Sequence, residues 1–464
     1  MTASVKNITF FINIHPELVY HIESAISTNK HDTSFVYRTV LYCKKSTMRK
    51  EGLHMDVQKR NFIIIWISNV LVAGTMTMIM PFLSLYIETF GDYSDAYVQK
   101  WSGLIFGASF VTAFIMSPIW GRVADKYGFK PILLINGFGI ATSVFLMGFV
   151  DSVEAFFLLR LLNGVVTGFI PTSLAFISSQ TAKKEAGKML GTLQMGSVTG
   201  TLFGPVFGGL LADTFGFQYT FVITSISVIV AAIIVLFGIK EQKRVKNLKA
   251  IQYSRKAIIS GLLHHRLMLN VMIVTALIQV GNFSIQPLLS LYVSHLTEAK
   301  DVAFLAGITF SAAGVGNLLF ARRWGKLGDD IGYEKVLSIL LLLSFVFIIP
   351  QAFVTQLWQL IFWRLLFGIA LGGMIPITTA LVRREAPIDI QGEVMGYNTS
   401  FRFLGNIIGP MFGGIVSGFI GISSVFIVTG VLFLVGFAFL YYAKRKPVQD
   451  FEDFLAAEEE RTHT

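Results

Sequence analysis

The sequence predicts an all-α membrane protein with twelve transmembrane helices arranged in two six-helix bundles. Three observations lead to this prediction. Hydrophobic residues make up 53% of the 464-residue chain and charged residues only 14%, a composition outside the usual range of soluble globular domains. A chain of this length has room for about twelve spans of ~20 residues each. A glycine–proline pattern around Gly204 also returns around Gly409, 205 residues later, so the chain contains an internal duplication.

Twelve apolar segments follow one another along the chain, each near the ~30 Å needed to cross the hydrocarbon core of a bilayer. The first six predicted spans lie at about 62–87, 98–119, 131–150, 155–179, 188–212 and 219–239. The second six lie at about 267–293, 303–321, 334–353, 357–381, 393–417 and 423–443.

These spans divide the chain into two bundles and three segments outside them. The bundles are expected at 55–239 and 267–446, joined by a basic cytoplasmic linker at 240–266. Residues 1–54 fit no span and are interpreted as a disordered extension or a mis-assigned start. The acidic tail at 447–464 is expected to be solvated.

Basic residues indicate the orientation of the chain in the membrane. They concentrate in the loops after the even-numbered spans, as at Arg122, Arg322 and Arg383, whereas the loops after the odd-numbered spans contain only Lys100 and Lys300. Because cytoplasmic loops carry the excess of Lys and Arg, both termini are expected to be cytoplasmic. The formal charge of +10 is therefore attributed to topology, and no nucleic-acid partner is expected.

The duplication extends along both halves. Arg160 in the fourth span corresponds to Arg364 in the tenth, and Asp125 after the second span corresponds to Asp329 after the eighth. Because each half has six spans, the two copies have the same orientation, and a pseudo-twofold axis along the membrane normal relates them.

The loop after the second span contains a motif with regular spacing. Its glycines are expected to permit a tight turn, and its aspartate can lie between basic groups and a helix N-terminus. Such a contact would hold one conformation until it is broken, although an ordinary polar turn is the alternative. The residues of this predicted conformational latch are Gly121, Asp125, Lys126, Gly128 and Lys130.

The glycine–proline pattern predicts close helix packing. Glycines four residues apart line one face of the fifth span, where another helix can approach closely, and Pro205 is expected to bend that helix. A dimerisation stripe is the alternative, but the second copy favours a helix pair within one chain. The motif residues are Gly200, Gly204, Pro205, Gly208 and Gly209, and in the second half Gly405, Gly409, Pro410, Gly413 and Gly414.

Polar residues inside the spans are candidates for a substrate path. An arginine at the centre of a span costs ~2.5–3.5 kcal/mol on insertion scales, although Arg160 lies near enough to a span end to reach the interface instead. Helical spacing groups the other polar residues into faces that avoid lipid, with packing as the alternative for each one singly. The candidates are Asn69, Met76, Met80, Asn163, Gln279, Asn282, Phe283, Gln286, Arg364, Asn398, Phe401 and Arg402.

These motifs resemble those of the major facilitator superfamily, and within it the twelve-span drug:proton antiporters. The segments MPFLSLYIETFG, WGRVADKYGFKP, LRLLNGVVTGFIPT and LGTLQMGSVTGTLFGPVFGGLLAD resemble the MdtG-like bacterial multidrug efflux proteins, over about residues 55–445. The resemblance implies the major facilitator fold in a bacterial cytoplasmic membrane, with spans 1, 4, 7 and 10 around a central cavity between two rocking halves.

The resemblance also implies roles for particular residues. Asp125 would belong to the conformational latch, and Arg160 would take part in proton coupling. Many antiporters of this kind have a carboxylate inside span 1 or span 4, but none occurs here within 61–87 or 155–179. Glu88, at the outer edge of span 1, is the nearest candidate.

The expected function is proton-driven export of small lipophilic, often cationic, compounds. A dedicated transporter of one metabolite, sugar or lipid is the alternative, and a membrane sensor would need an added soluble domain. The sequence contains no catalytic cluster, nucleotide loop or Cys/His cluster, so no enzymatic activity, cofactor or metal is expected. The predicted partners are substrate, protons and membrane lipid, with the protein a monomer.

Overall fold

Long apolar runs interrupted by short polar turns make the described part of the chain helical almost throughout. The computed structural model describes residues 57–181, 183–241, 255–387 and 390–444, and within them it contains no strand. Twelve helices in this described part are long and apolar enough to cross a membrane, which confirms the number of predicted spans. The predicted N-terminal extension, residues 242–254 of the linker and the acidic tail lie outside the described residues.

The first six spans belong to the first half of the chain. The first runs over Val57–Glu88 and ends in η1 (Met80–Phe82) and α4 (Leu83–Glu88). The others are α5 (Asp95–Tyr127), α6 (Phe129–Met147), α7 (Val153–Val165) with α8 (Phe169–Gln180), α9 (Lys183–Phe215) and α10 (Phe217–Gly238).

The second half repeats this order after α11 (Arg255–His264), a helix within the predicted linker. Its spans are α12 (Arg266–Ser284) with η2 (Gln286–Leu288) and α13 (Leu289–Leu296), α14 (Val302–Ile331), α15 (Tyr333–Ile348) with η3 (Ile349–Phe353), α16 (Leu357–Glu385), α17 (Gln391–Ile420) and α18 (Ile422–Lys444).

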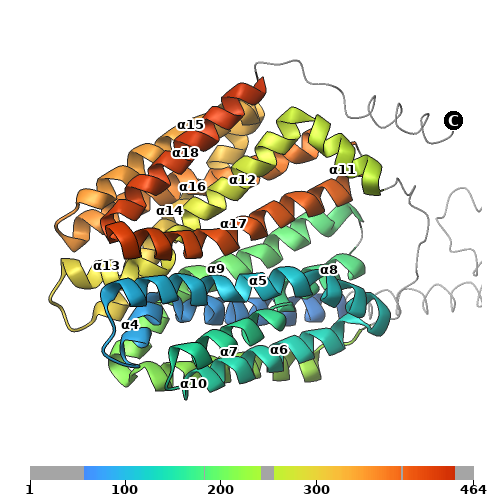
Figure 1. The fold of residues 1–464 in the computed structure, drawn as a ribbon. Helices are drawn as coiled ribbons and strands as arrows, with labels where there is room; N and C mark the ends of the chain where they lie inside the picture. The colour runs from blue at the N-terminus through green and yellow to red at the C-terminus, as the bar shows by residue number, and fades with distance from the viewer. Residues whose placement is uncertain (1–56, 182, 242–254, 388–389, 445–464) are drawn as a thin grey trace, which may run out of the picture. The chain divides into compact units, whose positions relative to one another are not determined.

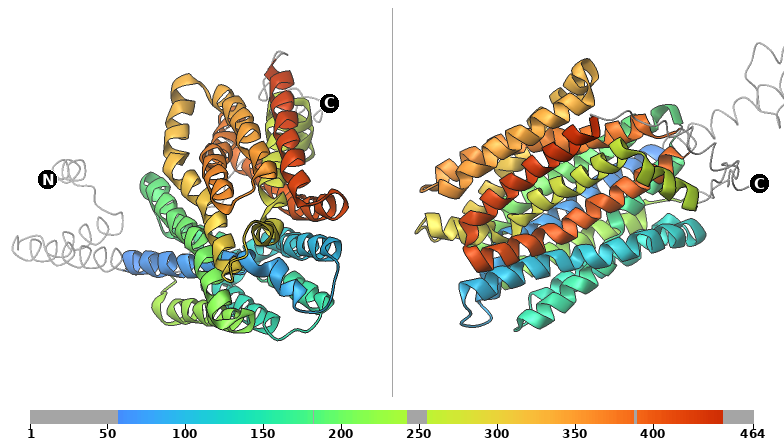
Figure 2. Two further views of the ribbon diagram at one scale, coloured as in Figure 1. Left: turned by 90° about the vertical axis from the view of Figure 1, so that its left-hand side faces the viewer. Right: turned by 45° about the horizontal axis from the view of Figure 1, so that its top comes forward.

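Residues from Ile64 onward form one compact unit that contains both halves. Figure 1 and Figure 2 show the first half in blue to green and the second in yellow to red. The halves meet along two pairs of helices, α9 with α14 and α5 with α17. Each pair therefore joins one span of the first half to one span of the second.

Equivalent hydrogen bonds in the two halves reflect the duplication. The Tyr86 hydroxyl donates to the Met147 carbonyl at 2.8 Å, and the Tyr292 hydroxyl donates to the Gln351 carbonyl at 2.7 Å. The Ser84 and Ser290 hydroxyls, which occupy equivalent positions, lie 2.6 Å apart. Equivalent residues can meet only near the axis that relates the halves, so this contact marks the pseudo-twofold axis.

Four glycines form the tight turns between consecutive spans. Gly128, Gly216, Gly332 and Gly421 have φ between 86° and 99°, a region that residues with a Cβ rarely adopt. The first of them corrects the prediction for the latch loop. Helix α5 continues to Tyr127, so Gly121 lies within a helix and the turn falls at Gly128.

The glycine stripe of α9 packs against the first span. A methyl group added at Gly200, Gly204 or Gly208 would overlap backbone atoms of Val70, Gly74 or Met78, respectively. In the second half, Gly405, Gly409 and Gly413 approach the backbone of α12 in the same way. The spacing therefore produces the close helix pair that it predicts, once in each half.

We expect Gly413→Val to destabilise the protein, because the added side chain would overlap the Ser284 carbonyl. Overpacking of this kind costs about 1–3 kcal/mol. Gly396→Val is the control, since Gly396 lies in the same helix with open space around it. Thermal unfolding of the purified protein in detergent should show a lower Tm for Gly413→Val alone; equal Tm values would contradict the packing argument.

Candidate functional site

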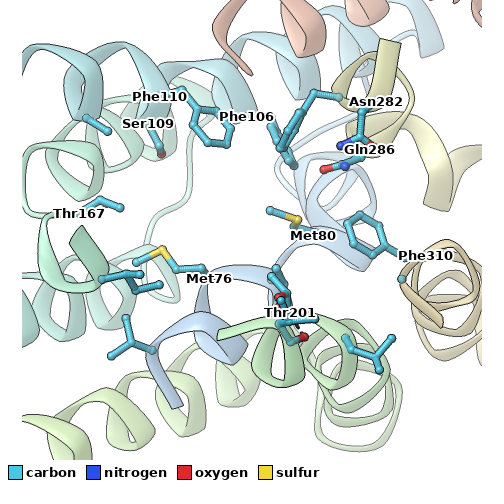
Figure 3. A pocket seen from close by; sticks show the side chains of 18 of the residues that line it. Met76, Met80, Phe106, Ser109, Phe110, Thr167, Thr201, Asn282, Gln286 and Phe310 are labelled. Carbon is cyan, nitrogen blue, oxygen red and sulfur yellow. Dashed lines mark hydrogen bonds between the residues drawn. The ribbon is translucent and has the colours of Figure 1, made fainter. Parts of the chain in front are cut away.

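A cavity of about 550 Å³ lies between the two halves. Figure 3 shows its lining, in which Met76 and Met80 come from the first span, Phe106 and Phe110 from α5, and Thr201 from α9. The lining is mainly apolar with a few polar groups, the usual character of a small-molecule site.

The duplication places equivalent residues on both sides of the cavity. Phe106 of α5 has its counterpart in Phe310 of α14, and both line the cavity. Where the first half contributes methionines, the second contributes amides: Met76 corresponds to Asn282, and Met80 to Gln286. At these two positions the halves therefore present different chemistry to the cavity.

Arg160 and Arg364, also equivalent, are the charged residues in the lining. Their side chains are buried, with 8% and 3% of their surface exposed. Within the described part of the chain, Nε and Nη2 of Arg160 and Nε of Arg364 have no hydrogen-bond partner. These nitrogens are unused donors beside the cavity.

Contacts between α7 and α5 fix the position of Arg160. The Ser109 hydroxyl donates to the Arg160 carbonyl at 2.9 Å, and the Thr112 hydroxyl donates to the Leu161 carbonyl at 2.8 Å. Gly164 allows this approach, because a methyl group there would overlap Ser109 and Thr112. The guanidinium lies 5.5 Å from the centre of the Phe156 ring.

The structure brings together part of the predicted substrate path. The predicted residues that line the cavity are Met76, Met80, Asn163, Asn282, Phe283, Gln286 and Arg364, together with Arg160. Asn163 also donates to the Ser143 hydroxyl at 2.8 Å, which fixes its amide at the cavity wall.

Five predicted residues do not line this cavity. Asn69 accepts a hydrogen bond from Ser173 at 2.9 Å, and Gln279 donates to Asn406 at 2.7 Å. These amides therefore join neighbouring helices instead of facing the cavity. The other three residues, all in α17, are Asn398, which is buried, and Phe401 and Arg402, which are half-buried outside the lining.

Spans 2, 5 and 8 also contribute to the lining, which the expectation of spans 1, 4, 7 and 10 omits. Phe106, Phe110, Phe310, Thr201 and Asn317 are the main additions. Phenylalanine is too common in membrane helices to be singled out. Two features of the sequence could have identified some of these residues: Phe106 and Phe310 occupy equivalent positions, and Asn317 is an asparagine inside a span.

The predicted carboxylates lie outside the cavity. Glu88 is exposed at the end of α4, and Asp125 is exposed near the end of α5. Among the described residues that line the cavity there is no Asp or Glu. The lining therefore carries positive charge alone.

The predicted latch loop holds a carboxylate that the motif does not include. Glu241 accepts hydrogen bonds from the Phe129 and Lys130 amides at 2.7 and 3.0 Å, and it thereby caps the N-terminus of α6. The Lys130 ammonium donates to the Ile239 carbonyl at 2.9 Å. Gly128 is favoured here because its φ of 99° is one that residues with a Cβ rarely adopt. In this conformation the loop anchors the end of α10.

The glycine–proline motifs also form the contact between the halves. A methyl group at Gly209 would overlap the Ala303 carbonyl of α14, and one at Gly307 would overlap the Pro205 carbonyl. Equivalent contacts join Gly103 of α5 to the Pro410 carbonyl and to Gly414 of α17. All these contacts lie toward the end of the molecule opposite the basic loops, so the halves are in close contact there.

Among the described glycines of these four helices, none contacts the other half at the end that carries the basic loops, called the basic end below. Six glycines of these helices at the basic end have open space within 4 Å of an added methyl group, and Gly328 of α14 contacts only side chains of its own half. The six are Gly121 of α5, Gly187 and Gly191 of α9, Gly325 of α14, and Gly392 and Gly396 of α17. The cavity therefore lies between halves whose close glycine contacts are found at one end only.

A sequence model of the Major Facilitator Superfamily matches residues 65–322 and 271–460. The chain belongs to the major facilitator superfamily. Twelve apolar helices and this family make it a multi-pass membrane transporter.

Relatives cover almost the whole membrane region of this superfamily member. The uncharacterized MFS-type transporter YuxJ of Bacillus subtilis is 53% identical over 82% of this chain and 97% of its own. The multidrug resistance protein MdtG of Dickeya zeae is 38% identical over 84% of this chain and 95% of its own. A solved bacterial homologue of the human lysosomal transporter Spinster has a TM-score of 0.70 at 16% identity, covering 85% of this chain and 98% of that one.

We expect Glu241→Ala to loosen the N-terminus of α6, because Phe129 and Lys130 would lose their shared acceptor. Loss of a helix cap costs about 0.5–2 kcal/mol. Hydrogen exchange in the peptide that contains both amides should accelerate by roughly 5- to 30-fold for a loss of 1–2 kcal/mol. Asp330→Ala, at the corresponding turn of the second half, is the control; equal exchange in both variants would contradict this role.

Proposed function

We propose that this transporter exports lipophilic small molecules across a bacterial cytoplasmic membrane by proton antiport with alternating access. The observation that carries the proposal is a largely apolar cavity between halves whose close glycine contacts are found at one end only. The relatives named multidrug resistance protein support export of drug-like compounds. Neither substrate nor proton requires a cofactor in this mechanism.

The orientation follows from the charges of the loops. Because basic loops remain cytoplasmic, the basic end faces the cytoplasm and both termini lie there. We infer that the conformation described above, with its close contacts at the opposite end, is closed to the outside and open to the cytoplasm. An exporter in this state receives its substrate from the cytoplasm or the adjoining lipid, and rocking of the halves would release it outside.

The charge of the cavity limits the substrates. A buried arginine repels a nearby cation, because Coulomb interactions between neighbouring charges in a protein reach several kcal/mol. No carboxylate in the described lining offsets the charges of Arg160 and Arg364. Unused guanidinium donors instead suit an acidic or strongly polar acceptor group. We therefore propose that lipophilic anions and neutral compounds are transported in preference to the lipophilic cations that the family resemblance favours.

The proton pathway is proposed to use groups outside the cavity together with Arg160. Asp125 and Glu88 remain the candidate carboxylates, one near each end of the first half. Arg160 would link protonation of these carboxylates to substrate binding, because a bound anion would neutralise the charge of the Arg160 guanidinium. The amides of Asn163, Asn282 and Gln286 would orient the substrate. Membrane lipid and protons are then the other partners of a monomer.

Transport in inside-out membrane vesicles should depend on a proton gradient. We expect uptake of a lipophilic fluorescent compound when respiration acidifies the vesicle interior, and loss of uptake on addition of a protonophore. Asp125→Asn should abolish the gradient-driven component, with vesicles lacking the protein as the blank. Uptake that persists at full rate with the protonophore would exclude proton antiport.

Neutralising either cavity arginine should change the charge preference of transport. We expect Arg160→Gln and Arg364→Gln to reduce transport of a fluorescein-type anion by roughly 10-fold or more, because a charge-assisted hydrogen bond contributes ~1.5–3 kcal/mol. Transport of a rhodamine-type cation should be unchanged or faster. Arg322→Gln, at an exposed site on α14, is the control. Equal losses for both dyes would indicate that the arginines act only in folding.

A further inference from the structure

An aspartate of the first half caps a helix of the second half. The Asp213 carboxylate, near the end of α9, accepts hydrogen bonds from the Phe304 amide at 2.7 Å and the Ala303 amide at 3.3 Å. Both amides belong to the first turn of α14. Gly209, one helical turn before Asp213, contacts the same turn of α14. The contact thus lies at the end where the two halves are closed.

Helix α14 already has a residue suited to cap it. Asp301 occupies the N-cap position but makes no side-chain hydrogen bond to the helix. An N-cap aspartate ordinarily accepts from the amides two or three residues further on, which here are Ala303 and Phe304. Asp213 therefore uses the same two amides that Asp301 would use. The two carboxylates also repel each other electrostatically, so they compete for one site.

The second copy of the motif lacks this arrangement. Gly418 of α17 is equivalent to Asp213, and there the side chain of Lys100 lies along α17, with its ammonium 4.3 Å from the centre of the Phe419 ring. The cap between halves is thus specific to α9 and α14. It is not a consequence of the repeated fold, because the repeat supplies no acceptor at the equivalent position.

We propose that Asp213 is a second latch, distinct from the latch loop after the second span, and that it favours the closed state of this end. Asp301 would replace it as the cap of α14 when the halves separate. The exchange keeps the first-turn amides of α14 bonded in both states, since unpaired amides at a helix end are unfavourable. The energy difference between the two states then depends on which carboxylate is the better acceptor. This inference rests on the alternating access proposed above and names the residues that control it at the closed end.

The latch predicts opposite effects for the two aspartates. Asp213→Ala should raise the ratio of open to closed protein about fivefold, as loss of one helix cap implies. Asp301→Ala alone should lower that ratio about fivefold, because the open state would lose its replacement cap while Asp213 still caps the closed state. Asp213→Asn, which keeps an acceptor oxygen without the charge, should give an intermediate ratio.

Distances between spin labels at Asp151→Cys and Thr355→Cys would measure this ratio by double electron–electron resonance. These equivalent positions are exposed near the ends of α6 and η3, and Cys43→Ser removes the chain's single native cysteine. Glu298→Ala is the control for a carboxylate in the same loop. No shift with Asp213→Ala, or a shift toward the open state with Asp301→Ala, would overturn the latch. Because no substrate or gradient is present, the result is independent of the transport assays.

Discussion

Close contact between helix backbones at the glycine–proline segments is the constraint on which the rest of this structure depends. Lipid provides little hydrophobic force to drive helices together, so they associate through close packing, which small residues permit. Each segment touches two neighbours at once. In α9, Gly204 and Gly208 approach the first span, while Pro205 and Gly209 approach α14 of the other half. One short motif thereby builds its own half and also joins the halves.

The cavity follows from closing these contacts at one end only. The space between the halves is lined chiefly by α5, α7, α8, α9, α12, α14 and α16 together with the first span. Two buried arginines remain beside it with unused donors. Such groups are unfavourable in a membrane unless a ligand or water can reach them, so their position indicates recognition of a polar group on an otherwise lipophilic molecule.

The duplication gives the molecule symmetry, and departures from that symmetry make the two sides of the cavity and the two interfaces between the halves different. The first half contributes methionines to the cavity where the second half contributes amides. The Asp213 side chain of α9 also caps a helix of the other half, whereas α17 has a glycine at the equivalent position. A perfectly symmetric pair of halves would give a substrate no preferred side. Changes at a few equivalent positions, such as Asp213 and Gly418, are enough to make the two interfaces energetically different.

The sequence by itself determined the twelve spans, the repeat and the close helix pairs, because hydrophobic length and glycine spacing are local properties of a chain in a bilayer. It also identified Arg160 and Arg364, since charge within a span stands out anywhere. Only the tertiary structure decided which polar faces meet the cavity. Helical spacing shows that Gln279 and Asn282 share a face, but not that a neighbouring Asn406 satisfies the first and leaves the second free to line the cavity. Glu241 likewise required the fold, because its partners at Phe129 and Lys130 lie over a hundred residues away.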